Sequence, residues 1–542
     1  MLFALVVAVV PVVMSVTVAI GVDLGVEQLR TVLYAAHSSL QFSIVEDDGG
    51  APSVPTAMAF HKKTGRRLVG QDALVFARRN PAFREPKRLL GELVDSPAAT
   101  GFKELFPTVT VTAVSEHDPS STVVLPSGRN TLPEEALAAL AADVVRLADV
   151  NVLVAPVGGL GGVAPRAVLT APTFWSAAKQ DALKQAFQLG GVDVLDVVDE
   201  LTAAAVDFTA MQLPTSAAQS TIIIFGAGAV GVGCAVFDVA TREPAGAMLV
   251  QRLAAEWDGN SGGADVDLAL LDALVKDVAN RDELLAPAAK IRLREAVREA
   301  KDVCLKNSPS CVVSVKELGF ERTLTQAAAE AATRVITARM VAPLERLLDR
   351  LGSLDVDAKS ISGIELFGGA SRFTPLQTAA AAVAKRHGLK LGHRLNTELS
   401  AAQGAARIAA SIVNPTARRV SLVEMQSLPA PGARERATPL SDLSLRLLRG
   451  NLAESLALEQ TLAARAAARS DFETFLGSAS ETLEALEASG TNVDAARAAL
   501  SAQRDFLDLA ADESTTVEEF SARLQNLKSV LAQGGGKAKA EL

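Results

Sequence analysis

The sequence has few aromatic residues, few cysteines and no long run of basic residues. Aromatic residues make up 4% of the 542 positions, whereas apolar residues make up 49%. The formal net charge is −9, so the basic surface that attracts nucleic acid is missing. We therefore expect no nucleic-acid partner, and the length and apolar content predict about two to four domains with large cores.

The scarcity of cysteine excludes further classes of protein. Cys234, Cys304 and Cys311 form neither a metal-binding spacing nor a disulfide framework. Cys304 and Cys311 could pair in an oxidising compartment. We nevertheless expect them to be free, buried thiols, because an unpaired cysteine behaves as a small apolar side chain.

The stretch Thr221–Asp238 is the one around which the sequence is organised. Four β-branched residues run into a glycine-rich turn and a second apolar run leaves it, a pattern typical of two strands joined by a hairpin. Backbone N–H groups at such a turn can bind anions such as phosphate. A shorter counterpart, Val18–Glu27, carries Asp23 at its turn. Either stretch alone is equally compatible with a structural hairpin, but together they suggest duplicated lobes with a phosphate loop in each.

Both ends of the sequence carry features of targeting segments. Leu2–Val13 is an apolar run followed by Ser15, which predicts a secretory signal peptide over residues 1–15, although its start lacks Lys and Arg. A membrane anchor is less favoured, because the run continues directly into a strand, and a single buried strand is the remaining alternative. Lys539–Leu542 resembles the Lys-Asp-Glu-Leu retention signal, with Ala540 in place of aspartate. We expect a protein of the endoplasmic reticulum lumen without a stable membrane anchor.

Strands and helices alternate in the first half of the chain. Arg166–Phe208 reads as a strand, an amphipathic helix, a second strand and an alanine-rich helix, which predicts α/β layering. Thr131 followed by Pro133 and two glutamates predicts the start of another helix.

Taken in order, these segments resemble the heat-shock protein 70 superfamily over nearly the whole chain. The matching segments are Ile20–Gly25, Glu85–Gly91, Leu132–Leu140, Ala167–Ala205, Ile222–Gly233, Gly262–Asp267, Leu366–Arg372 and Asn396–Ala406. The resemblance implies an actin-like α/β domain of two RNase H-like lobes that holds ATP or ADP with Mg²⁺ in its cleft, followed by an α-helical lid-like bundle. The divergence most resembles the large lumenal branch, of the glucose-regulated protein 170 and heat-shock protein 110 type. Members of that branch also carry an acid after the first phosphate loop, as Glu27 does here.

The resemblance also implies a domain plan. Its parts are a signal peptide (1–15), an ATP-binding domain (16–412), a linker or vestigial β-segment (413–439), a helical bundle (440–532) and a tail with the retention-like segment (533–542). The family's peptide-binding β-sandwich needs several strands, and the linker has room for one or two, such as Val420–Met425. Thr516–Glu519 reads as a capping box that opens the last helix. The helices form either a self-packed bundle or an arm for a partner.

The resemblance assigns site roles position by position. Lys87, Glu200 and Asp23 take the catalytic positions: Lys87 would face the γ-phosphate, and Asp23 and Glu200 would hold the water shell of Mg²⁺. The expected nucleotide-binding residues are Gly25, Val26, Gly228, Gly231, Gly262, Gly263, Lys301, Gly368, Gly369, Arg372 and Glu398. Among these, Lys301, Gly368, Gly369 and Arg372 would flank the adenosine. Without the resemblance, Lys87 reads as a solvated lysine and Glu200 as an acid at a helix start.

Several positions depart from the family pattern. Gly226 and Gly233 stand where the family has aspartates, and Gly231 stands where it has a threonine near the γ-phosphate. Val26 and Asp302 likewise replace a threonine and an arginine. Loss of carboxylates weakens the positioning of a metal and the activation of water. We expect nucleotide binding to survive on backbone contacts and fast hydrolysis to be lost.

Two functional classes follow. The first is a lumenal co-chaperone that binds ATP, hydrolyses it weakly, and acts as a nucleotide exchange factor or holding chaperone on a conventional lumenal heat-shock protein 70, with unfolded polypeptides as a second class of partner. The alternative is a chaperone that hydrolyses ATP and folds clients directly. A sugar kinase of the same fold is less favoured, because the lid-like helices have no place in it.

Overall fold

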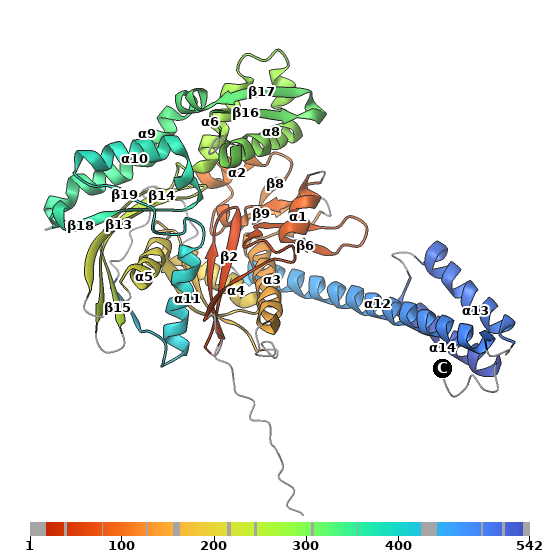
Figure 1. Cartoon of the computed structure of the whole chain (residues 1–542). Coiled ribbons are helices and arrows are strands. Elements are labelled where there is room, and N and C mark those ends of the chain that lie inside the picture. Colours follow the sequence, from red (N-terminus) through yellow and green to blue (C-terminus); the bar gives the residue numbers. More distant parts are fainter. Residues whose placement is uncertain are drawn as a thin grey trace, which may run out of the picture. The chain divides into compact units, whose positions relative to one another are not determined.

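A computed structural model describes most of the chain (Figure 1). The described residues are 18–36, 41–78, 80–125, 128–154, 163–213, 218–242, 246–304, 308–354, 356–423, 442–488, 492–511 and 515–534. The expected signal peptide and retention-like segment lie outside them. The chain divides into two compact units, the first formed by residues 1–59 with 68–448 and the second by residues 60–67 with 449–542.

The first sheet carries the first glycine turn. Its strand order is β12-β11-β1-β2-β3, and β4 pairs with β2. β1 runs antiparallel to β2 across the turn and parallel to β11 on its other side. The strands are β1 (Val18–Leu24), β2 (Gln28–Ala35), β3 (Phe42–Val45), β4 (Val54–Pro55), β11 (Arg166–Ala171) and β12 (Asp193–Asp199).

The second sheet carries the second glycine turn, in the order β19-β18-β13-β14-β15-β20. The hairpin expected over Thr221–Asp238 is confirmed: β13 and β14 are antiparallel, and Gly226 lies opposite Gly233. A strand expected within Val420–Met425 is present as β20, which pairs with β15. The strands are β13 (Gln219–Ala227), β14 (Val232–Arg242), β15 (Ala247–Asp258), β18 (Ile361–Phe367), β19 (Leu391–Gly392) and β20 (Val420–Val423).

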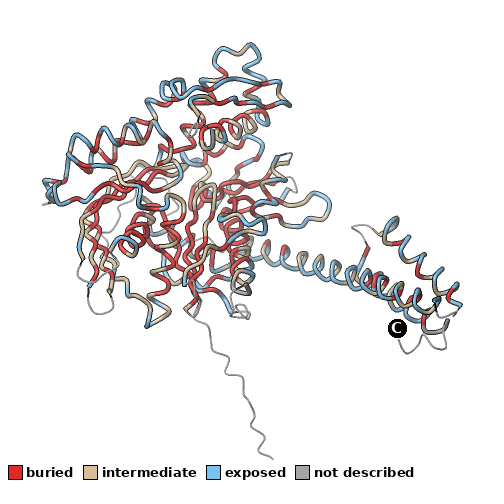
Figure 2. Tube along the Cα trace, in the orientation of Figure 1, coloured by how far each residue is buried: buried red, intermediate tan, exposed pale blue. Residues whose placement is uncertain are grey.

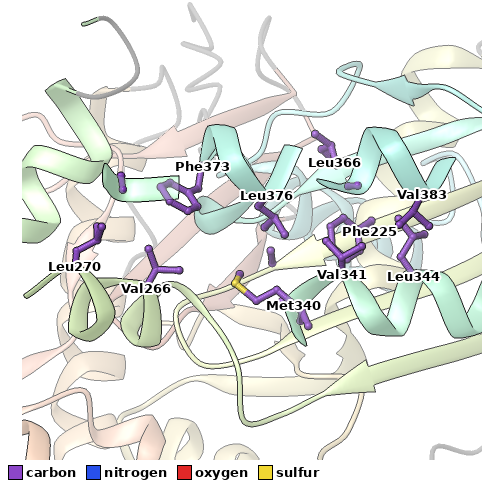
Figure 3. Packing of buried hydrophobic residues seen from close by; sticks show 14 of the residues in the cluster. Phe225, Val266, Leu270, Met340, Val341, Leu344, Leu366, Phe373, Leu376 and Val383 are labelled. Atoms are coloured by element: carbon purple, nitrogen blue, oxygen red, sulfur yellow. The ribbon is translucent and has the colours of Figure 1, made fainter. Parts of the chain in front are cut away.

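Helices cover both sheets and fill the space between them. Apolar side chains of α3 and α4 pack on one face of the first sheet, and those of α9 and α10 pack on the second sheet around Phe225 (Figure 3). α5 and α11 share one buried cluster with strands of both sheets. The helices are α3 (Pro133–Val154), α4 (Ala177–Leu189), α5 (Glu200–Gln212), α9 (Gln326–Arg350), α10 (Thr374–Arg386) and α11 (Ser400–Val413). This confirms the α/β layering expected for Arg166–Phe208.

Glycines allow α11 to approach its neighbours closely. A Cβ atom on Gly21 of β1 would lie 2.1 Å from the backbone N of Ala406, and one on Gly404 would lie 1.8 Å from the carbonyl oxygen of Ala203. Both distances are too short for any side chain. Backbone contact therefore joins α11 to the first sheet and to α5, which fixes the helix pair between the two sheets.

Two insertions complete the first unit. The first comprises β5 (Ala57–Phe60), β6 (Arg67–Val69), α1 (Gly70–Ala77), β7 (Phe83–Arg84), a 3₁₀ turn (Pro86–Arg88), α2 (Pro97–Leu105), β8 (Thr110–Ser115), β9 (Asp118–Val124) and β10 (Asn130–Thr131). The second comprises α6 (Gly263–Val275), α7 (Arg281–Leu284), α8 (Pro287–Glu299), β16 (Ser310–Val315) and β17 (Phe320–Thr325). Residues 60–67 of the first insertion group with the second unit.

The second unit is helical and has its own core. It contains most of α12 (Asp442–Ala488), α13 (Asp494–Asp505) and α14 (Val517–Gly534). Phe472, Phe506 and Phe520 lie within 6.5 Å of one another between ring centroids and are buried with leucines from all three helices. Figure 2 shows exposed residues along much of α12 and buried ones where the three helices meet. The two-lobed α/β fold followed by helices is thereby confirmed.

The expectation of a free thiol at Cys311 is wrong. Cys311, on β16, is disulfide-bonded, whereas Cys234 is free and buried. The side chain of Cys304 lies outside the described residues. A disulfide sulfur fits apolar surroundings as well as a free thiol does, so expected burial alone could not separate the two states.

Within the described ranges, no helix combines the length and apolar character needed to cross a membrane.

Candidate functional site

A cleft of about 340 Å³ lies where the glycine turns of the two sheets meet. Residues of both turns, of the 3₁₀ turn at Lys87 and of the start of α5 line it. Its lining includes ten of the expected residues: Asp23, Gly25, Val26, Lys87, Glu200, Gly228, Gly231, Gly368, Gly369 and Glu398. The fold thus brings most of the predicted site into one cavity.

Lys87 reaches the cleft from a buried turn. Its ammonium group donates a hydrogen bond to the carbonyl oxygen of Leu24 and lies 5.2 Å from the ring centroid of Trp175. Burial lowers the pKa of Lys87, while Glu200 and Asp23 act in the opposite direction. Glu85, two residues before Lys87, has a φ angle of +54°, and positive φ angles are uncommon for residues with a side chain. Lys87 is therefore a buried cation held in place, and the solvated reading is wrong.

Asp23 and Glu200 face Lys87 from two different elements. Asp23, near the end of β1, accepts a hydrogen bond of 2.6 Å from the hydroxyl of Thr170. Glu200 is the first residue of α5, and the cap of that helix is Asp199, which accepts from the N–H of Leu201 at 2.8 Å. Burial raises the pKa of Glu200 to about 7; Lys87 lowers it, and Asp23 and Asp199 raise it further. Near neutral pH, Glu200 is therefore shared between its neutral and ionised forms.

Backbone hydrogen bonds hold the second glycine turn in place. The N–H of Gly228 donates to the carbonyl oxygen of Gly231 at 2.8 Å, which closes the turn. The N–H of Gly263 donates to the carbonyl oxygen of Gly228 at 2.9 Å, and a Cβ on Gly262 would lie 2.6 Å from the carbonyl oxygen of Ala229. Gly262 and Gly263 therefore support the loop instead of lining the cleft.

Gly368 needs to be a glycine. Its φ angle is +84°, and a Cβ atom there would lie 2.4 Å from the carbonyl oxygen of Ala227. Few residues with a side chain adopt such a backbone conformation. A side chain at position 368 would therefore collide with the backbone of the second glycine turn, and Gly368 and Gly369 line the cleft without one.

Lys301 and Arg372 line a second, smaller cavity of about 100 Å³. Lys301 pairs with Asp267 at 2.6 Å and donates to the carbonyl oxygen of Gly263 at 3.2 Å. Burial lowers the pKa of Lys301, but Asp267 and Asp302 outweigh it, so that the pKa is raised. Arg372 pairs with Glu398, which itself lines the main cleft. The expected adenosine residues are thus divided between the two cavities.

Sequence reasoning missed the aromatic and charged partners of the site. Trp175 lies over Lys87, and Lys179 lies 5.9 Å from the same ring. Arg298 of α8 pairs with Glu27 at 2.6 Å. Trp175 stands in a segment that matches the family, but the match does not indicate its contact with Lys87. The contact of Arg298 with Glu27 joins residues far apart in sequence, and no local pattern indicates it.

Magnesium is the least well supported part of the expected site. A Cβ atom on Gly226 would lie 2.7 Å from a methyl carbon of Leu201, and one on Gly233 would lie 3.5 Å from the other. Leu201 therefore fills space beside both missing aspartates. No group of three or more potential ligands gathers anywhere in the part of the chain that the structure describes. Of the carboxylates that the resemblance places around the metal, Asp23 and Glu200 remain in the cleft, so this chain offers a magnesium ion fewer ligands than the family pattern does.

The family model and the similar proteins found by comparison agree on one family. The family model described as Hsp70 protein matches residues 19–431. The chaperone protein DnaK of Deinococcus deserti is 28% identical over 373 residues, which cover 65% of this chain and 54% of the relative. A heat shock protein of Pyricularia oryzae is 26% identical over 398 residues, covering 72% of this chain and 60% of the relative. The heat shock protein 70 homolog of Acanthamoeba polyphaga mimivirus is 24% identical over 378 residues, covering 66% and 37%. The chain therefore spans from about a third to three fifths of the length of these relatives.

Proposed function

The chain belongs to the Hsp70 family, and on that premise we propose that it is an ATP-binding chaperone or co-chaperone of the endoplasmic reticulum lumen. We further propose that it acts as a nucleotide exchange factor or holding chaperone with weak hydrolysis, within the large lumenal branch of the family. Glu27, after the first phosphate loop, supports that branch.

Nucleotide binding is supported by the cleft. Hsp70 proteins in general use ATP or ADP with magnesium. Here the two glycine turns, Lys87 and Gly368 line one cavity of about 340 Å³. Such a volume lies in the range of small-molecule sites. Backbone groups at the turns and one buried ammonium suit a phosphate chain.

The proposal of weak hydrolysis rests on a single observation, which is that apolar side chains of neighbouring segments pack beside the second glycine turn. A Cβ atom on Gly231 would lie 2.9 Å from the ring of Phe174, and Leu201 stands beside Gly226 and Gly233. No polar side chain reaches the phosphates from these three positions. Phosphoryl transfer depends on positioned charge. The loss of polar side chains at these positions therefore slows ATP hydrolysis more than it weakens nucleotide binding.

A role on a partner chaperone is supported by the helical second unit. In the sequence, residues 413–439 leave room for one or two strands, whereas a peptide-binding sandwich needs several. The helices of the second unit nevertheless form a folded bundle around Phe472, Phe506 and Phe520. A folded helical arm, preceded by so little sequence for a peptide cradle, suits contact with another protein better than direct folding of clients.

The lumenal location is supported by features of three regions. Leu2–Val13 resembles a signal peptide, and Lys539–Leu542 resembles a retention signal. The disulfide at Cys311 adds support, because disulfides persist in oxidising compartments and are rare in the cytosol.

The test is the release of labelled ADP from a conventional lumenal heat-shock protein 70. We expect the ATP-loaded full chain to accelerate release, and a truncation after Leu448, where the first unit ends, to lose the effect. Absence of acceleration together with tight capture of unfolded chains would assign a holding chaperone. Absence of both effects would refute a partner role.

The alternative, an ATP-hydrolysing chaperone that acts directly on clients, is favoured by one observation. Lys87, Asp23 and Glu200, the expected catalytic residues, are brought together in the cleft. Single-turnover hydrolysis decides between the two: a rate equal to that of a conventional family member would support the alternative.

A further inference from the structure

Apolar side chains pack beside the second glycine turn of the cleft. Leu201 approaches the Cβ positions of Gly226 and Gly233 to 2.7 Å and 3.5 Å. The ring of Phe367 stands 3.2 Å from the same Cβ position of Gly226, and Phe174 stands 2.9 Å from that of Gly231. Apolar side chains therefore pack against three positions of the loop. These apolar side chains offer no oxygen atom to the water shell that magnesium keeps.

Most acids around the cleft are already paired with cations. Glu92 pairs with Lys179 at 2.5 Å, and Glu27 pairs with Arg298 at 2.6 Å. Glu398 lies against Arg372 and, at 3.6 Å, against Arg30. These ion pairs are built within the protein and leave the charges of the acids balanced. These paired acids are consequently poor ligands for a divalent ion.

Asp23 and Glu200 are the lining carboxylates that face Lys87. Asp23 is also committed to Thr170. An aspartate at 226 or 233 would add negative charge beside the phosphates, and such charge is tolerable only when a cation neutralises it. With glycine at both positions this added repulsion is absent and Asp23 and Glu200 are the carboxylates that remain beside Lys87, so the need for a metal to screen the phosphates falls.

Lys87 supplies a fixed positive charge in its place. Its ammonium is held by the carbonyl oxygen of Leu24 and by the face of Trp175, so little reorganisation is needed when an anion arrives. The backbone of Gly228, Ala229 and Val230 lines the same cavity. One buried cation and a glycine turn together form an anion site made of protein groups alone.

We propose that this cleft binds its nucleotide without a divalent metal ion, with Lys87 and the backbone of the second glycine turn facing the phosphates. The proposal rests on the nucleotide binding proposed above. It goes further by specifying the ligand as the free nucleotide anion.

The test is isothermal titration calorimetry of the full chain with ATP and with ADP, once in excess MgCl₂ and once in excess EDTA. We expect the dissociation constants in the two conditions to agree within about threefold, which is less than about 1 kcal/mol. Binding in MgCl₂ that weakens more than about thirtyfold in EDTA would overturn the proposal while nucleotide binding stands. Absence of binding in both conditions would refute the proposed function itself.

A designed variant tests the cause. Leu201→Ala with Gly226→Asp and Gly233→Asp removes the close methyl contact and adds two carboxylates. We expect binding by this variant to become dependent on MgCl₂ by at least about tenfold. The matched control carries asparagine in place of both aspartates, which keeps the shape and removes the charge, and should stay insensitive to EDTA. A folded aspartate variant that remains insensitive would refute the role given to the glycines, and the wild-type titration decides the proposal if the variants do not fold.

Discussion

The buried carboxylate of Glu85 offers the sharpest test of the electrostatics around the cleft. It lies in the turn that presents Lys87, is 3% exposed, and pairs with Arg88 and, at 3.7 Å, with Arg294. Burial raises the pKa of Glu85, but Arg88 and Arg294 outweigh it and hold the pKa at about 2 instead of 4.5. The folded protein therefore favours the ionised form much more strongly than the unfolded chain does.

The sign and size of the effect follow from this shift. A lowered carboxyl pKa contributes stability that is fully present above pH 4.5 and is lost as the pH falls from 4.5 toward 2. A shift of this size corresponds to about 3 kcal/mol. Glu85→Gln removes that contribution and also leaves Arg294, which is 5% exposed, without its carboxylate. We expect the variant to lose about 3 kcal/mol at pH 7, and the difference from wild type to shrink below pH 4.5.

The measurement is urea unfolding at a series of pH values, followed by tryptophan fluorescence. Both tryptophans of the chain, Trp175 and Trp257, lie in the first unit, so the signal reports on the unit that contains Glu85. Asp48→Asn is the matched control: Asp48 pairs with Arg146 at 2.8 Å, but its side chain is 72% exposed, and such a pair contributes less than about 1 kcal/mol. Equal effects of the two substitutions, or a Glu85→Gln difference independent of pH, would refute the reasoning.

Three further predictions address the cleft and the helices. Gly368→Val should abolish ATP binding in calorimetry, because its Cβ atom would lie 2.4 Å from the carbonyl oxygen of Ala227; intact binding would remove this turn from the nucleotide site. Phe472→Ala should destabilise the second unit by about 3–5 kcal/mol, measured by urea unfolding with circular dichroism, while tryptophan fluorescence of the first unit stays unchanged. Single-turnover hydrolysis of ATP should be far slower than in a conventional family member, because Gly226, Gly231 and Gly233 supply no polar side chain; an equal rate would contradict this.

Local patterns in the sequence predicted the elements that carry the site. β-branched residues on either side of a glycine turn suffice for the hairpin over Thr221–Asp238, and Pro133 with two following glutamates suffices for the start of α3. The position of Glu200 at a helix start was visible for the same reason. Such features depend on neighbours within a few residues, so they can be read without the fold.

Contacts between distant segments could not be predicted. Gly262 and Gly263 were expected to touch nucleotide, but a glycine that admits a ligand and one that admits another backbone have the same sequence signature. In the structure both glycines lie against Gly228 and Ala229, and their contact with nucleotide stays a prediction. The burial of Lys87 under Trp175 could not be predicted either, because Trp175 follows a strand that lies far from Lys87 in the sequence.

The start of α5 shows why the altered loop cannot be judged from its glycines alone. Three consecutive residues there serve three different surfaces: Asp199 pairs with Arg252 of β15 at 3.1 Å, Glu200 faces Lys87, and Leu201 fills the space beside Gly226. Because Asp199 caps the helix and binds the second sheet, Leu201 cannot shift without disturbing the position of Glu200. An aspartate at 226 would therefore press on a leucine held on both sides. Restoring the carboxylates requires a smaller side chain at 201, so the loop and the helix start have to be changed together.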